Sequence, residues 1–311
     1  TDNVSLKYRH GGLEIFVNGY FHGGKRRFHD VPSMTTYGES IFEQLINAYT
    51  INTIRNFSGK IGFNYQIGEN HSFGGYFETG SMKAKPNGSI ESVVTNDGKP
   101  YEKLSTIQSA VERTMPSHEA NVYYSGKIGN SYVDFNADYV ENNSKKDFTH
   151  FETDENDSER TVITDAGNRK RLLAEKLNVS YPLWNGQIEV GEEYTNSKVS
   201  YNSVYTGADI SGSDTRINED NISAFVELTQ TFGKFQTGLG VRFEHVRYKY
   251  YEGNRLDEDR SRTYNNWFPS VFASTKIGRV GLSLNITSRT TRPSYYQLDG
   301  ALQYINRYSY Q

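Results

Sequence analysis

Residues 133–139 read VDFNADY and residues 280–287 read VGLSLNIT. In both stretches an apolar side chain stands at every second position, with a polar or small one between. This period of two predicts a β-strand with one apolar and one polar face. The pattern recurs along nearly the whole chain, and it predicts about thirteen strands. They lie near residues 3–10, 13–28, 55–67, 70–84, 117–128, 130–145, 170–182, 186–206, 217–232, 234–252, 262–277, 279–292 and 300–311.

The connections between these segments alternate between short and long. Short turns are expected at residues 10–12, 68–70, 129, 184–186, 233 and 278, and long loops near 29–54, 85–116, 146–169, 207–216 and 253–261. Sorting by length is typical of an outer-membrane barrel, which has tight periplasmic turns and long extracellular loops. The sequence therefore predicts an all-β fold, an antiparallel up-and-down transmembrane β-barrel forming a single domain over residues 1–311.

Composition agrees with a barrel and excludes other classes. Aromatic residues make up 14% of the chain, and its mean hydropathy is −0.73, too polar for a protein of membrane-spanning helices. A barrel turns only every second residue toward lipid, so a polar average is expected. A net charge of −3 argues against nucleic acid as a partner, and the absence of cysteine excludes disulfides and thiolate metal sites.

The order of short and long connections also predicts where the chain ends lie. The first strand would begin on the extracellular side, and the thirteenth would stop while descending. Closed bacterial barrels have an even number of strands. We therefore expect an internal fragment of a larger barrel.

Two of the expected loops have a helical pattern. In residues 40–51 the apolar side chains fall on one helical face, and residues 104–112 show a weaker version. We interpret both as helical turns packed on the rim.

The polar alternates of the strands are the candidate lumen-facing residues. Mixed charges there suit a lumen filled by a folded plug, and they equally suit a water-filled pore. The candidates are Lys60, Asn64, Asp134, Asn136, Asp138, Arg242 and Glu244.

Tyrosines at the extracellular strand ends are the candidate substrate-binding residues. Their rings could stack on a sugar or a siderophore, or form the aromatic girdle at the membrane interface. They are Tyr201, Tyr205, Tyr250, Tyr251, Tyr295 and Tyr296.

No pattern of catalytic or metal-binding residues stands out. The seven histidines are scattered, without an HExxH motif or a pair at metal-ligand spacing. We expect no enzyme activity, no metal and no cofactor.

Residues 292–295 (RPSY) and 267–270 (WFPS), together with the strand start at 221–227, resemble the barrel of TonB-dependent outer-membrane receptors, especially the type found in Bacteroidetes. The resemblance is strongest over about 217–311. It implies a plugged barrel of about 22 strands. It also implies four partners: outer-membrane lipid, a plug domain of the same parent chain, TonB through a region N-terminal to this one, and a surface lipoprotein.

Three functions follow from these observations. The leading hypothesis is a receptor barrel in the bacterial outer membrane for TonB-dependent uptake of a glycan or an iron chelate. The alternative is a passive porin-like or structural barrel. A third is a soluble carbohydrate-binding β-protein, in which the apolar faces would form the core of a sandwich.

Overall fold

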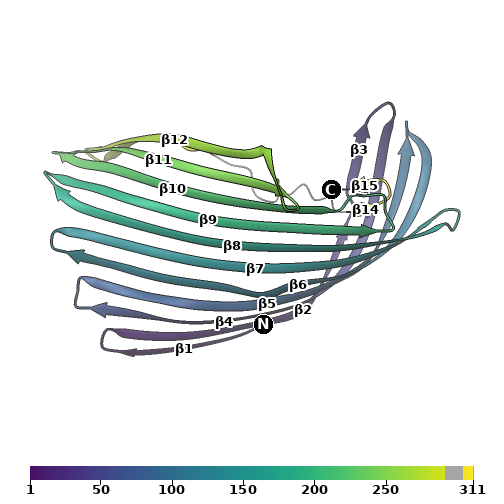
Figure 1. Cartoon of the computed structure of the whole chain (residues 1–311), viewed down its shortest axis with the longest axis horizontal. Helices are drawn as coiled ribbons and strands as arrows, with labels where there is room; N and C mark the ends of the chain where they lie inside the picture. The colour runs from purple at the N-terminus through teal and green to yellow at the C-terminus, as the bar shows by residue number, and fades with distance from the viewer. Residues whose placement is uncertain (291–303, 311) are drawn as a thin grey trace.

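The computed structural model describes residues 1–290 and 304–310. Thirteen strands form one antiparallel sheet in which neighbours along the chain pair with each other, apart from β3, which branches off β4 (Figure 1). This confirms the all-β antiparallel prediction. The strands are β1 (Asp2–His10), β2 (Leu13–Asp30), β3 (Ser33–Tyr37), β4 (Ile41–Ile67), β5 (His71–Asn96), β6 (Lys99–Ile128), β7 (Ser131–Asp154), β8 (Glu159–Leu183), β9 (Gly186–Thr206), β10 (Ser213–Phe232), β11 (Phe235–Glu252), β12 (Arg255–Ile277) and β13 (Val280–Thr287).

The predicted short turns are confirmed, and they share one rim of the sheet, which we call the tight-turn rim. Glycine with a positive φ occupies five of the six turns, where a side chain would strain the backbone. Trp184 takes the same conformation at the sixth turn, with a φ of 53°. These glycines are Gly11, Gly68, Gly129, Gly233 and Gly278.

The predicted long loops are mostly wrong, because the strands continue through them. β4 to β8 contain between 24 and 30 residues each, so they extend well beyond the roughly ten that a bilayer requires. On the opposite rim, which we call the extended rim, the described connections are only residues 31–32, 38–40, 97–98, 155–158, 207–212 and 253–254. The ranges 29–54, 85–116, 146–169, 207–216 and 253–261 therefore contain β3 and the outer ends of paired strands.

The two predicted helices are also wrong. Residues 40–51 lie almost entirely in β4 and residues 104–112 lie in β6. In β4, Gln44 and Ile46 are buried while Leu45 between them is exposed, which is the period of a strand. Pairing with β5 continues to Phe42, so tertiary pairing overrides the local helical pattern.

The predicted thirteenth strand, residues 300–311, does not join the sheet over its described part. Residues 304–310 form a separate hairpin of β14 (Tyr304–Asn306) and β15 (Ser309–Tyr310). The Asn306 side chain accepts hydrogen bonds from the Tyr308 backbone N–H (2.9 Å) and the Ser309 hydroxyl (3.1 Å). Such local bonds favour a turn over an extended strand.

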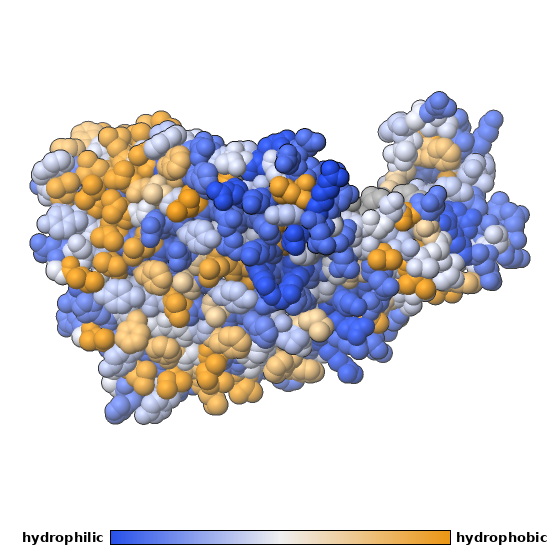
Figure 2. Space-filling model, in the orientation of Figure 1, coloured by the Kyte–Doolittle hydropathy of each residue, from blue (hydrophilic) through white to orange (hydrophobic). Residues whose placement is uncertain are grey.

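The two faces of the sheet differ in chemistry. Large apolar side chains are exposed on one face, for example Ile61 (54% exposed), Leu239 (60%) and Leu284 (57%). Figure 2 shows such side chains gathered over the half of the sheet near the tight-turn rim, with polar side chains over the extension. An exposed apolar band of this kind marks contact with lipid. Two carboxylates, Glu175 and Glu192, interrupt the band on β8 and β9.

Charged side chains mark the upper limit of the band on β7 and β8. Two residues beyond Tyr139, Glu141 forms ion pairs with Arg169 (2.7 Å) and Arg171 (3.2 Å) on the same face. We expect the strands beyond this level to be extracellular, because the larger projections of such barrels face outward.

β6 contains a β-bulge. Its register with β7 shifts between Thr114 and His118, where four residues of β6 span the distance that three span on β7. Pro116, which lacks an N–H for the ladder, lies in the bulge. Because of the extra residue, the even-numbered residues of β6 face inward before the bulge and the odd-numbered ones after it.

β1 and β13 are the edges of the sheet, and within the described ranges they do not pair with each other. The same ranges contain no helix that is both long enough and apolar enough to span a membrane.

Candidate binding surface on the inner face of the sheet

The seven predicted lumen residues share one face of the sheet. Residues directly opposite each other in an antiparallel pair point to the same side, so the face can be followed from strand to strand. The register leads from Lys60 through Glu78 and Glu119 into β7, and from there to Arg242 on β11. We call this the inner face, because the β14–β15 hairpin packs on it and the apolar band lies on the other side.

The inner face carries a charged group on β4 and β5. The Lys60 ammonium lies 3.4 Å from a Glu78 carboxylate oxygen and 3.3 Å from the centre of the Tyr76 ring. The Tyr76 hydroxyl donates a hydrogen bond to Glu119 on β6. Three strands are thus joined by one cation, its carboxylate and a tyrosine.

Amide side chains form two further hydrogen-bonded sets on the inner face. Asn64 accepts a hydrogen bond from the Tyr123 hydroxyl (2.9 Å) and donates one to Glu14 on β2 (3.4 Å). Asn121 donates to Asn136 (2.9 Å) and to Asp138 (2.6 Å). Asn136 in turn donates to the other oxygen of Asp138 (2.6 Å). Together with the group around Lys60, these two sets of hydrogen bonds cover the inner face from β2 to β7.

A second charged group lies on β9 and β11. The Arg242 guanidinium contacts the Glu193 carboxylate and also Glu244, whose oxygen is 3.0 Å from Arg242 Nε. Asp134, the remaining predicted residue, shares the face but is exposed.

The inner face is thus polar and largely paired within itself, while carboxylate oxygens, hydroxyls and amides remain at its surface. Such a surface can hydrogen-bond a polar solute or a folded protein segment. Tyr76, Glu119, Asn121, Tyr123 and Glu193 were missing from the sequence prediction. Their positions at alternate residues of predicted strands could have identified these residues apart from Tyr123, which Tyr124 follows directly.

The outer part of the inner face is covered by the β14–β15 hairpin. Arg307 lies among three carboxylates, at 3.4 Å from Glu102 and Glu152 and 3.3 Å from Asp154. The Tyr304 hydroxyl donates to the fully buried Glu152 (2.7 Å). Figure 1 shows the hairpin beside the extended parts of the strands. The three carboxylates therefore form a cation-binding site on the inner face, and Arg307 of the same chain occupies it.

Two titratable groups near the hairpin have pKa values below their ordinary range. Burial lowers the pKa of His150, next to this site on β7, to about 4. The Ser158 N–H is the main cause of the lowered pKa of Asp154, and Asn156 and Arg307 add to it. Across residues 1–290 and 304–310, no three His, Asp or Glu side chains are placed to hold a metal ion.

The predicted substrate-binding tyrosines do not form one cluster. Tyr201 and Tyr205 lie on the inner face of β9. Tyr250 is buried against Val199 and Ile217, whereas Tyr251 lies on the outer face beneath Arg216, 4.3 Å from its ring centre. Tyr295 and Tyr296 lie outside the described residues.

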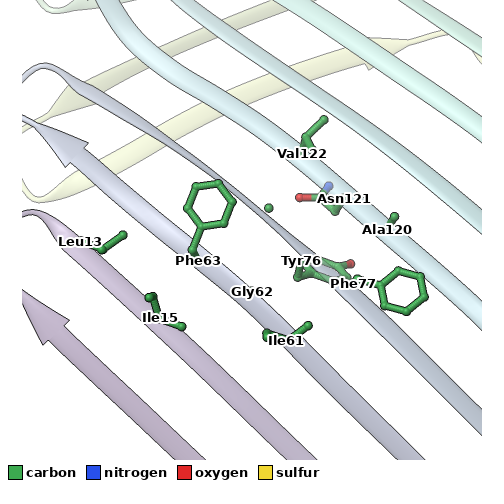
Figure 3. A pocket seen from close by; sticks show the side chains of 11 residues that line it. Leu13, Ile15, Ile61, Gly62, Phe63, Tyr76, Phe77, Ala120, Asn121 and Val122 are labelled. Carbon is green, nitrogen blue, oxygen red and sulfur yellow. The ribbon is translucent and has the colours of Figure 1, made fainter.

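An apolar groove of about 510 Å³ lies on the outer face of β2 to β6. Figure 3 shows Ile15, Ile61, Phe63 and Phe77 around it. It lies over Gly75, where no side chain fills the surface. Its apolar lining suits a hydrocarbon chain. In this respect the groove differs from the polar inner face.

Comparison with known proteins gives one family match. A model of the outer membrane protein beta-barrel family matches residues 127–311. No curated protein sequence matches the chain.

Several solved structures are distantly similar. The translocator domain of the autotransporter NalP from Neisseria meningitidis is 10% identical, with 91% of this chain and 84% of that chain covered and a TM-score of 0.31. The outer membrane protease OmpT from Escherichia coli is 13% identical, with 92% and 97% covered and a TM-score of 0.29. BauA, the ferric preacinetobactin receptor from Acinetobacter baumannii, is 11% identical, with a TM-score of 0.30. There 92% of this chain aligns, and it spans 59% of the receptor chain.

Proposed function

Because the chain belongs to the outer membrane protein beta-barrel family, and therefore to the bacterial outer membrane, we propose that it forms the barrel of a receptor for TonB-dependent nutrient uptake. The nutrient would be a glycan or an iron chelate. The role is not enzymatic and requires no cofactor, and the barrel is of the Bacteroidetes type.

The observation that supports this proposal is the hydrogen-bonded network of the inner face. Lys60, Glu78, Tyr76 and Glu119 hold one another in fixed positions across three strands. A pre-organised polar wall binds a partner at lower entropic cost than free side chains would. We propose that its main partner is a folded plug domain of the parent chain, which TonB remodels.

The long strand extensions support a receptor role as well. They project a broad extracellular surface beyond the apolar band, and a nutrient, or a surface lipoprotein that delivers one, would bind there. Lipid is the partner of the outer face.

The hypothesis of a soluble carbohydrate-binding protein is wrong. A sandwich core would bury the apolar alternates, whereas Ile61, Leu239 and Leu284 are exposed on the outer face. The family match places the chain in the outer membrane.

An uptake assay would test the proposal against the passive porin-like alternative. A strain lacking the gene would be complemented with the intact parent gene, and uptake of labelled iron chelates and oligosaccharides measured with and without an uncoupler of the proton-motive force. Energy-dependent uptake of one nutrient class supports a receptor. Uptake that persists in uncoupled cells, or in a strain without TonB, would instead establish a passive pore.

A further inference from the structure

Four cations stand side by side on the outer face of the extended strands. Arg55 on β4 lies directly opposite Lys83 on β5, Lys83 opposite Arg113 on β6, and Arg113 opposite Lys145 on β7. We call these four residues the cation row. Lys25 and Lys85 add to it, because they lie on either side of Thr53 in the adjacent row.

This arrangement is unfavourable for the protein alone. Side chains directly opposite in an antiparallel sheet have Cβ atoms only about 4.5–5.5 Å apart, and like charges there destabilise the pairing. Only Arg113 has an acidic partner, Asp147, at 2.8 Å. Among the residues that the structure describes, no carboxylate pairs with Arg55, Lys83 or Lys145. The row therefore spans four adjacent strands and presents unneutralised positive charge at Arg55, Lys83 and Lys145.

The cation row begins where the apolar band ends. Arg55 is two residues beyond Phe57 on the same face of β4, and Phe57 is an exposed aromatic of the band. All four side chains of the row are exposed. At this level a membrane offers lipid head groups rather than hydrocarbon.

The apolar groove lies on the same strands, closer to the tight-turn rim. Ile61, which lines it, is six residues from Arg55 along β4, and Phe77 is six residues from Lys83 along β5. Six residues of strand correspond to about 20 Å. A single lipid could therefore place its head group at the row and a hydrocarbon chain in the groove.

We propose that the cation row binds the phosphate groups of a phosphorylated glycolipid of the outer leaflet, with an acyl chain of that lipid in the groove. Arginine forms paired hydrogen bonds to phosphate and lysine adds point charge. Neighbouring strands are about 4.8 Å apart, so the row spans about 14 Å and can contact more than one phosphate. The proposal depends on the membrane location and is independent of any transport function.

Lipid-dependent stabilisation of the full-length protein tests this proposal. The row variant R55Q/K83Q/K145Q is compared with the control variant K127Q/K234Q/K276Q, which removes the same charge at the tight-turn rim. Each purified protein is titrated in detergent with bisphosphorylated lipid A, with the same lipid lacking phosphates, and with inorganic phosphate, and its thermal unfolding midpoint is recorded. We expect the row variant to bind the phosphorylated lipid at least about tenfold more weakly than wild type. The control should match wild type.

A second readout does not depend on added lipid. Since the row repels itself, the row variant should unfold at a higher temperature than wild type in lipid-free detergent at low salt, and the difference should shrink as salt screens the charges. Equal lipid binding by the row variant and wild type would overturn the proposal. An equal effect of the dephosphorylated lipid, or of inorganic phosphate at the same concentration, would also overturn it. If R55Q/K83Q/K145Q does not fold, the single variants K83Q and K83R replace it, and only K83R should retain binding.

Discussion

Asn121 illustrates how single residues stabilise the inner face. Its one amide group donates to both Asn136 and Asp138, so it joins β6 to β7 at a half-buried position. A polar group that loses its partner in such a place costs more than the bond itself contributed.

We therefore predict that Asn121→Ala destabilises the barrel by about 1–2 kcal/mol. Asn143→Ala is the matched control, because the side-chain amide oxygen of Asn143 has no hydrogen-bond partner among the described residues. Its loss should be neutral. Urea titration of the refolded protein in detergent, followed by tryptophan fluorescence, measures both. Equal effects of the two variants would show that the Asn121 bonds contribute nothing specific.

The lowered pKa of His150 predicts that the stability of the extended rim depends on pH. Its pKa lies at about 4 in the folded protein, against an ordinary value of 6.5, so the unfolded segment binds a proton more readily than the folded one. The neutral ring therefore stabilises the fold above pH 6.5, and this contribution is lost as the pH falls from 6.5 to 4.

Hydrogen exchange of residues 148–152 measures this effect. After correction for intrinsic rates, protection should fall between pH 6.5 and 4 in the wild-type protein. His150→Phe, which cannot bind a proton, should keep its protection over the same interval. Protection that falls equally in both proteins would exclude His150 as the cause.

At the scale of elements, the β14–β15 hairpin depends on the ion pairs of Arg307. Glu152 is fully buried, and removing its cation leaves an unpaired charge. We predict that Arg307→Met favours release of the hairpin by about 3–5 kcal/mol.

Limited proteolysis within residues 304–310 reports that release. The double variant Arg307→Met/Glu152→Gln should recover much of the protection, because the fully buried charge at position 152 is then removed. Arg279→Met, at an exposed turn, is the control and should resemble wild type. A hairpin that stays protected in Arg307→Met alone would show that the ion pairs do not hold it.

The elements could be predicted from sequence where the alternation is apolar against polar. Residues 133–139 and 280–287 lie in β7 and β13, and the turn glycines are placed correctly. The outer ends of the strands could not be predicted. There the outer face contacts water, and the inner face carries small residues with only scattered larger apolar ones. In residues 81–92, for example, Ala84 and Ile90 are buried among polar neighbours, so the alternation is weak. The pattern resembles a loop, while cross-strand pairing makes it a strand.

The residues of the inner face likewise divide into those that the sequence could predict and those that it could not. Lys60 and Arg242 were predicted because each lies in a clean apolar alternation. In residues 117–128 both faces carry tyrosine, so Tyr123 could not be told from Tyr124 without the register. The contact between Glu152 and Arg307 joins residues 155 positions apart, and no local pattern could predict it.

At the scale of the whole molecule, lipid is the solvent of the outer face. Leu284 and Ser283 are neighbours on β13, both are exposed, and they point to opposite faces. We predict that Leu284→Arg reduces stability in bilayers by about 2–4 kcal/mol. Ser283→Arg should have little effect, since its side chain lies on the polar face. Folding yield in lipid vesicles measures both, and equal yields would contradict the assignment of faces.

The bulge divides β6 into two parts: even-numbered residues face inward in the first part and odd-numbered residues in the second. Arg113 lies in the cation row and Leu104 lies in the interior only because one extra residue precedes Ser117. Deleting that residue would exchange the two faces of the outer half of β6. Arg113 would turn inward, and Leu104 would turn toward water. A single-residue deletion at residues 115–116 would therefore move about fifteen side chains from one face of the sheet to the other at once. We expect insertions and deletions in this strand to be tolerated in pairs and not singly.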